Sequence, residues 1–209
     1  MGALDRMGAD KMGLDPVEKQ NIVSEWRAKS PRITQFWRDV ENRIRVYATY
    51  ARTTYAPLGM WLKTRRDGDF AQILLPSGRA ISYYRLEQQA ESGTLLYQCG
   101  PSEKTDVYGG KFTENIVQAI ARDCLAASLI LLRKAGFRVV GHVHDEVIVE
   151  VPASCADEIL KEICRIMETC IGWDDPQRAY PVRSVAFPPK ARRLPLVAAG
   201  YVTPYYRKD

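Results

Sequence analysis

Residues 141–151 read Gly-His-Val-His-Asp-Glu-Val-Ile-Val-Glu-Val, and they constrain the fold more than any other stretch of the chain. β-Branched side chains on both sides of a short polar segment predict two paired strands that meet at a turn of His144, Asp145 and Glu146. Two-residue hairpin turns favour Asn-Gly or Asp-Gly, because their central residues need positive φ, and this turn has no glycine. Adjacent carboxylates repel each other unless a cation lies over them, and a hard divalent cation suits their oxygens. The segment predicts a metal-holding hairpin, and an ordinary solvated tip is the alternative.

A long helix is predicted upstream of this hairpin, over residues 113–134. Thr113 is placed to cap it, Arg133 and Lys134 suit its last turn, and Gly136 supplies the stop. Apolar residues at helical spacing predict its core face: Ile116, Ile120, Cys124, Ala127 and Leu131. A second stripe is polar or basic and has no acidic member: Lys111, Asn115, Gln118 and Arg122. This stripe suits phosphates and base edges, and a solvated helix face is the alternative reading.

The remaining segments predict further helices and strands. Asp15, Pro16 and Glu18 form a helix-start signal with a capping box, and Ser30-Pro31 separates that helix from the next. The second helix shows an apolar period: Ile33, Phe36, Trp37, Val40, Ile44 and Tyr47. Residues 70–75 and 79–84 flank Pro-Ser-Gly and predict a β-hairpin, with a further strand at 94–99, a Tyr-Gly-Gly hinge at 108–110 and an amphipathic helix at 159–170. Residues 176–190 are Pro- and Arg-rich connecting chain.

Composition agrees with a folded, non-secreted protein. The 209 residues suffice for one or two domains, and a net charge of +5 is a mild basic excess that fits a polyanionic partner. No secretory signal is visible, and no apolar run approaches the roughly 20 residues of a membrane span, so no membrane partner is expected. The five cysteines are odd in number and form no C-x-x-C pair, so we expect reduced thiols in a cytoplasmic setting.

The hairpin also resembles a known motif. Residues 143–147, Val-His-Asp-Glu-Val, look like motif C of the family A DNA polymerases, the family of bacterial DNA polymerase I. The resemblance implies that Asp145 ligates two catalytic Mg²⁺ ions, that Glu146 is an auxiliary acid beside them, and that His144 lies near the primer terminus. Asp145 and Glu146 are therefore the expected catalytic and metal-binding residues.

Three other segments are similar to the same family. Residues 112–123 resemble the helix that precedes motif C, where a glutamine, here Gln118, touches the primer-template minor groove. One departure is Glu114, because bacterial members usually carry Asn at that position, and Glu114 receives no role. Residues 194–200 and 205–209 resemble the tail of phage-encoded members, and residues 1–45 resemble the fingers helices that follow motif B. The expected DNA contacts are His144, Lys111, Asn115, Gln118 and Arg122.

The resemblance implies an α+β fold in which a palm-like antiparallel hairpin and sheet pack with helices. Residues 1–60 are expected to be a helical segment from the rear of the fingers, and residues 61–209 a palm-like region. Motif A, with its Asp-Tyr-Ser-x-x-Glu pattern, and motif B, with Arg-x-x-x-Lys and Tyr-Gly, are both missing. We therefore expect a C-terminal polymerase fragment that is inactive alone. Its expected partners are primer-template DNA, deoxynucleoside triphosphates and the remainder of the polymerase, in a bacterial or phage-infected cell.

Two other functions remain open from the residues themselves. The missing motifs and the basic helices allow a non-catalytic nucleic-acid-binding module. Alternatively, His142, His144 and Asp145 could bind a metal in a small metal-binding protein, because residues two apart in a strand share a face. With only two histidines and no cysteine nearby, a closed zinc site cannot be completed locally.

Overall fold

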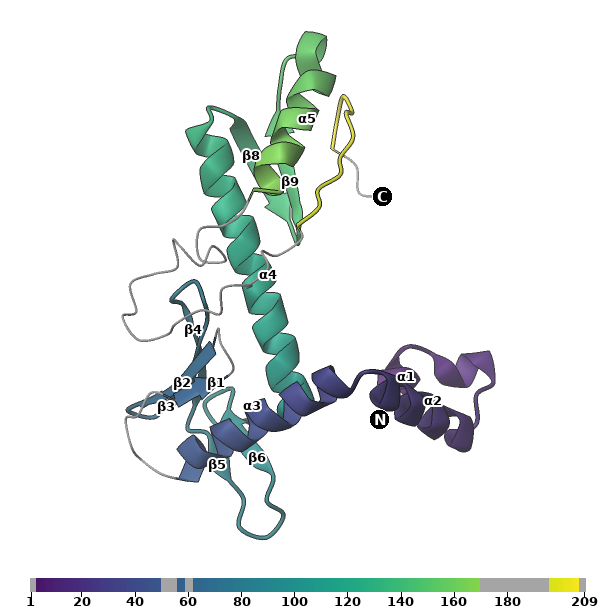
Figure 1. Cartoon of the computed structure of the whole chain (residues 1–209), viewed down its shortest axis with the longest axis vertical. Coiled ribbons are helices and arrows are strands. Elements are labelled where there is room, and N and C mark those ends of the chain that lie inside the picture. The colour runs from purple at the N-terminus through teal and green to yellow at the C-terminus, as the bar shows by residue number, and fades with distance from the viewer. Residues whose placement is uncertain (1–2, 50–55, 59–61, 170–195, 207–209) are drawn as a thin grey trace.

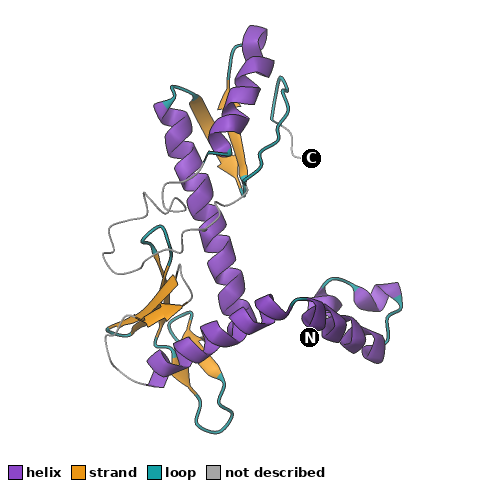
Figure 2. Ribbon diagram, in the orientation of Figure 1, coloured by secondary structure: helices purple, strands orange, loops and turns teal. Residues whose placement is uncertain are grey.

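The computed structural model describes residues 3–49, 56–58, 62–169 and 196–206. It mixes helices with antiparallel sheets, which confirms the predicted α+β class (Figures 1 and 2). The helical elements are α1 (Ala3–Arg6), the 3-10 turn η1 (Ala9–Met12), α2 (Pro16–Lys29), α3 (Pro31–Thr49), α4 (Gly109–Lys134), the 3-10 turn η2 (Ala153–Cys155) and α5 (Ala156–Met167). The strands are β1 (Ala56–Leu58), β2 (Leu62–Asp67), β3 (Phe70–Leu74), β4 (Ala80–Tyr84), β5 (Glu87–Gln88), β6 (Leu95–Gln98), β7 (Lys104–Val107), β8 (Arg138–Val143) and β9 (Glu146–Glu150).

The first two long helices follow the sequence signals. The Asp15 carboxylate accepts a hydrogen bond from the Glu18 backbone N–H at 2.8 Å, and the Glu18 carboxylate accepts one from the Asp15 N–H at 2.9 Å. This is the predicted capping box at the start of α2. Helix α3 buries Val40 and Ile44 completely. Ile33, which belongs to the same apolar period in the sequence, is 45% exposed and lies in the first turn of α3, beside the junction with α2.

Nine strands form three separate antiparallel sheets in the described part of the chain. β1 to β4 make a four-stranded meander, β5 to β7 a three-stranded one, and β8 and β9 a hairpin of their own. The predicted β3–β4 hairpin is confirmed. Its turn is closed by the Leu75 N–H, which donates to the Arg79 carbonyl at 2.8 Å, and Gly78 takes a φ of 87° that favours glycine.

The larger hydrophobic core lies where α3, the first two sheets and the first half of α4 meet. Its buried members are Val40, Ile44, Ala71, Ile73, Leu75, Tyr83, Leu86, Leu95, Val107, Phe112 and Ile116. Because α3 shares this core with strands that follow residue 60, the two regions are packed together. The division of the chain at residue 60 stays a prediction.

Helix α4 begins four residues earlier than predicted. Its first residue, Gly109, donates its N–H to the Glu41 carboxylate of α3 at 2.7 Å, and a Cβ there would lie 2.2 Å from the Trp37 carbonyl oxygen. Only glycine fits such an approach of two backbones. Thr113 therefore lies inside the helix, where its hydroxyl donates to the Gly109 carbonyl at 2.9 Å. The prediction that Thr113 caps the helix is wrong.

The far end of α4 supports a second, smaller core. The helix ends as predicted, with Gly136 at a φ of 89° and the Phe137 N–H donating to the Leu132 carbonyl at 3.1 Å. Leu132 is fully buried against Ile163 and Ile166 of α5. Partly buried side chains of the β8–β9 hairpin complete this core: Val139, Val147 and Val149. α4 thus joins the two cores, one at each end (Figure 1).

Helix α4 is long and apolar enough, by length and composition, to cross a membrane. Arg122 and Asp123 interrupt the apolar sequence of this helix, so residues 109–134 contain no uninterrupted apolar run of that length. Core helices of soluble proteins pass the same test, so the finding is weak support for a span. In this structure α4 packs against α3, β4, β8 and α5.

Candidate functional site

The β8–β9 hairpin presents its carboxylates at an exposed tip. Val143 pairs with Glu146, so the turn contains only His144 and Asp145, and Glu146 already belongs to β9. This corrects the predicted three-residue turn. His144 has a φ of 51°, the left-handed region that histidine tolerates better than β-branched residues do. All three side chains of His144, Asp145 and Glu146 are exposed, so the tip is open to a ligand or a partner.

A register shift between Val139 and Gly141 makes a bulge within β8. The residue between them, Val140, is 54% exposed and does not join the valines that face α4 and α5. Bulges bend a strand and re-aim the side chains beyond them. In this hairpin the bulge precedes His142 and the turn. Val139 of β8 and Val147 and Val149 of β9 pack against the smaller core.

The chain's last described segment reaches the same hairpin. The Tyr206 hydroxyl donates to the Glu146 carboxylate at 3.3 Å, and desolvation, followed by the charge of Glu146, raises the pKa of Tyr206. The segment is fixed along α5, where the Ala198 N–H donates to the Glu168 carboxylate at 3.0 Å. Sequence reasoning did not identify Tyr206 as a site residue, and its only signal was the resemblance of residues 205–209 to a polymerase tail.

The polar stripe of α4 is only partly free for a ligand. The Lys111 ammonium lies 3.0 Å from the Glu114 carboxylate, and the Asn115 amide donates to the Tyr83 hydroxyl at 2.9 Å. Tyr83 is 2% exposed, and burial raises its pKa to about 12. Gln118 and Arg122 are exposed, and neither side chain bonds to another among the residues that the structure describes. Gln118 and Arg122 are therefore the two stripe residues that are most accessible to a ligand.

The carboxylate tip lies at about the level of Arg122, the last residue of the stripe along α4. β8 runs back alongside α4 after the reversal at Gly136 (Figure 1). Six strand residues span about 20 Å, the rise of about 13 helical residues, which returns the chain to the level of Arg122. A ligand long enough to lie along α4 could thus approach both.

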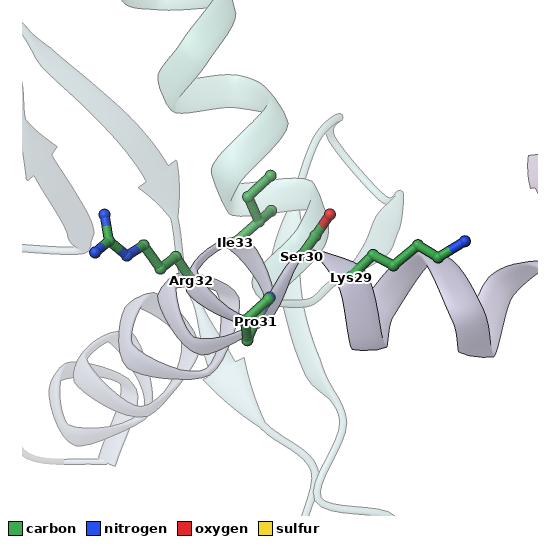
Figure 3. A pocket seen from close by; sticks show the side chains of 5 residues that line it. All are labelled: Lys29, Ser30, Pro31, Arg32 and Ile33. Carbon is green, nitrogen blue, oxygen red and sulfur yellow. The ribbon is translucent and has the colours of Figure 1, made fainter.

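A hollow of about 410 Å³ lies at the junction of α2 and α3, far from the carboxylate tip (Figures 1 and 3). It is lined by Lys29, Ser30, Pro31, Arg32 and Ile33. The Lys29 and Arg32 side chains extend in opposite directions, away from one another (Figure 3). The lining holds no carboxylate or histidine to activate the Ser30 hydroxyl, so this hollow does not offer an alternative catalytic centre.

Nowhere in the described ranges do three or more His, Cys, Asp or Glu side chains gather into a group that could hold a metal. The alternative trio of His142, His144 and Asp145 is therefore not assembled, because the strand alternation ends at Val143 and His144 lies in the turn. Four cysteines form no disulfide among the described residues: Cys99, Cys124, Cys155 and Cys164. Cys170 and the connecting chain at 176–190 lie outside the described residues.

Comparison with known proteins gives one informative similarity. The DNA polymerase of Bacillus phage SP02 is 36% identical over 216 aligned residues, which cover 100% of this chain and 30% of that polymerase. The chain thus spans about 30% of the length of the relative that it matches. The expected resemblance to part of a phage DNA polymerase is confirmed, and the assignment to family A stays a prediction. Neither a family model nor a solved structure matches the chain.

Proposed function

We propose that this chain works as part of a family A DNA-directed DNA polymerase and supplies the motif C carboxylates for nucleotidyl transfer. The observation that carries the proposal is the stiff hairpin whose exposed tip presents Asp145 and Glu146 next to each other. The similarity of the whole chain to 30% of a phage DNA polymerase supports it independently. Under this proposal the chain supplies part of an active site, and other segments of the polymerase supply the rest.

The donor chemistry of the tip fits Mg²⁺ in part. Mg²⁺ prefers carboxylate oxygens and is commonly held by one or two carboxylates together with substrate phosphates. Asp145 would be the ligand from this chain and Glu146 the auxiliary acid, and the absence of a third ligand among the described residues leaves room for a carboxylate from motif A. When bound, the two ions would activate the primer 3′-hydroxyl and stabilise the leaving pyrophosphate. The hairpin's contribution is to hold two negative charges at a fixed point.

The same proposal assigns the DNA contacts. His144 at the hairpin tip would lie near the primer terminus, and Gln118 and Arg122 would meet the duplex along α4. Lys111 and Asn115 remain proposed contacts, although both have partners within the chain. Deoxynucleoside triphosphates, the rest of the polymerase and the cytoplasm of a bacterial or phage-infected cell complete the proposed setting. Residues 1–60 would derive from the fingers and residues 61–209 from the palm.

The missing motifs lead to a first expected result. The purified 209-residue chain, mixed with primer-template DNA, Mg²⁺ and all four deoxynucleotides, should not extend the primer. The reason is that motif A supplies the other metal-binding carboxylate and motif B the nucleotide contacts. A gel assay of primer length, with a complete phage polymerase as the positive control, measures this. Robust templated extension by the pure chain would contradict the proposal that residues outside this chain complete the active site.

A non-catalytic nucleic-acid-binding module remains the second candidate function, because Gln118 and Arg122 are exposed on α4 and the chain carries a net charge of +5. Such a module would bind duplex DNA equally well with or without the carboxylates of the hairpin. The polymerase proposal instead requires Asp145 for turnover. Activity measurements on variants of the complete polymerase distinguish the two.

A second expected result concerns the two exposed stripe residues in the complete polymerase. Gln118→Ala should weaken primer-template binding with little change in salt dependence, because a minor-groove contact involves base edges. Arg122→Ala should lower the slope of log affinity against log salt by about one, because one phosphate would lose its cation. Titrations at several salt concentrations measure both effects. If affinity and slope stay unchanged in two folded variants, α4 does not bind DNA through this face.

A further inference from the structure

The tip of the β3–β4 hairpin is bonded to α4 beside the proposed DNA-binding residues. Asp123 of α4 accepts a hydrogen bond from the Ser77 hydroxyl at 2.6 Å and one from Arg79 Nε at 2.7 Å. Arg79 also donates from Nη2 to the Ala119 carbonyl at 2.8 Å, one helical turn earlier. The Asp123 side chain is only 12% exposed, whereas that of Arg79 is 47% exposed. The hairpin thus covers a carboxylate and leaves a guanidinium at the surface.

Asp123 carries a negative charge on a helix that is proposed to bind DNA. It directly follows Arg122, and a bare carboxylate at this point would repel the phosphates that Arg122 is proposed to meet. Charge-assisted hydrogen bonds to Arg79 and Ser77 neutralise Asp123 and direct its oxygens toward the hairpin. The stripe had no acidic member in the sequence, but its immediate neighbour is acidic, and the neutralising group comes from more than 40 residues away in the chain.

We propose that Arg79 and Ser77 act as positioning residues that screen Asp123 and so keep the face of Gln118 and Arg122 open to DNA. This inference rests on the proposed function, because it presumes that this face meets a duplex. The β3–β4 turn is then part of the DNA-binding apparatus, although neither Arg79 nor Ser77 needs to touch DNA. A purely structural role for the same bonds predicts a loss of thermal stability and no selective effect on DNA affinity.

The test is duplex binding by the complete polymerase that contains this chain, measured at low salt by fluorescence anisotropy of a labelled primer-template. Arg79→Gln removes the charge and keeps a hydrogen-bond donor, so it should weaken binding by about three- to tenfold, as one uncompensated charge near a phosphate would. Arg79→Gln/Asp123→Asn should restore binding to within about twofold of wild type, because the carboxylate is gone as well. This rescue is the readout that a merely structural bond would not produce.

The same hairpin offers a matched control. Arg85 pairs with Asp69 at 3.4 Å at the opposite end of the hairpin, and its side chain is 59% exposed. Arg85→Gln changes the net charge of the chain equally and should leave affinity within about twofold. Circular dichroism and thermal unfolding of each variant confirm that the fold is kept.

The outcomes separate the inference from the function on which it rests. If Arg79→Gln and Arg85→Gln weaken binding equally, or if Asp123→Asn fails to rescue a folded Arg79→Gln chain, the screening role is overturned. If Arg122→Ala weakens binding but Arg79→Gln does not, only the screening role falls. Should the complete polymerase bind duplex independently of Arg122, the proposed DNA contact and the screening role both fall.

Discussion

Asp145→Asn in the complete polymerase is expected to lower turnover by about three orders of magnitude, with a much smaller change in primer-template affinity. The substitution nearly keeps the side-chain volume and removes the negative charge that would hold a metal ion at the hairpin tip. Single-turnover extension under saturating nucleotide separates the chemical step from DNA binding. The effect should appear in the rate of extension and hardly in the dissociation constant of the duplex.

The same hairpin supplies the control for this variant. Glu150 lies at the other end of β9, is exposed, and pairs with Arg138 at 3.1 Å. Glu150→Gln removes the same charge from the same element, so turnover should stay within about twofold of wild type. Near-normal turnover of Asp145→Asn would make Asp145 a turn residue only and would leave the hairpin without its proposed role.

Gly109→Ala is expected to destabilise the chain by about 2–3 kcal/mol, because the new Cβ would overlap the Trp37 backbone. The carbonyl oxygen and carbon of Trp37 lie 2.2 Å and 2.7 Å from that position, and backbone atoms cannot move aside as a flexible side chain can. The α3–α4 crossing would have to open, which would also disturb the bond from the Gly109 N–H to Glu41. Thermal unfolding should show a drop in midpoint of roughly 5–10 °C for a chain of this size.

Gly110→Ala is the matched control for that prediction. Its Cβ would meet only the ring of Tyr108, at 2.9 Å, and that side chain is exposed and can turn away. Alanine also favours the helical backbone over glycine by up to about 1 kcal/mol. We expect Gly110→Ala to be close to wild type in stability. Equal losses in the two variants would show that helix entry, and not the close approach to Trp37, sets the requirement for glycine.

Short sequence patterns correctly predicted the features that depend on neighbouring residues, such as helix caps and turns. The capping box at Asp15, the Gly136 stop and the Pro-Ser-Gly hairpin all depend on residues within a few positions of one another, and all are present in the structure. The carboxylate hairpin was predicted for the same reason, because alternation and β-branching are visible in a short window. Its exact turn differed by one residue, since the pairing of Val143 with Glu146 is set by the register and the bulge in β8.

The features that sequence reasoning missed depend on residues far apart in the chain. Gly109 begins α4 because α3 supplies Glu41 and a close backbone, which no helix-start signal encodes. Asn115 looked like a free stripe residue, yet its amide bonds to Tyr83, 32 positions away. Asp123 and Arg79 form their pair across 44 positions, and Tyr206 meets Glu146 across 60. Tertiary contacts of this kind override local expectation.

The most direct test of the central claim is a crystal structure of the complete polymerase with primer-template DNA, an incoming nucleotide and Mn²⁺, read by anomalous scattering. The account predicts an anomalous peak within about 2.0–2.3 Å of an Asp145 carboxylate oxygen, with octahedral oxygen ligands that include a second carboxylate from outside this chain. The duplex should lie along α4, beside Gln118 and Arg122. A bound duplex and nucleotide with the metal peaks held by other residues, and none within reach of Asp145, would contradict the account.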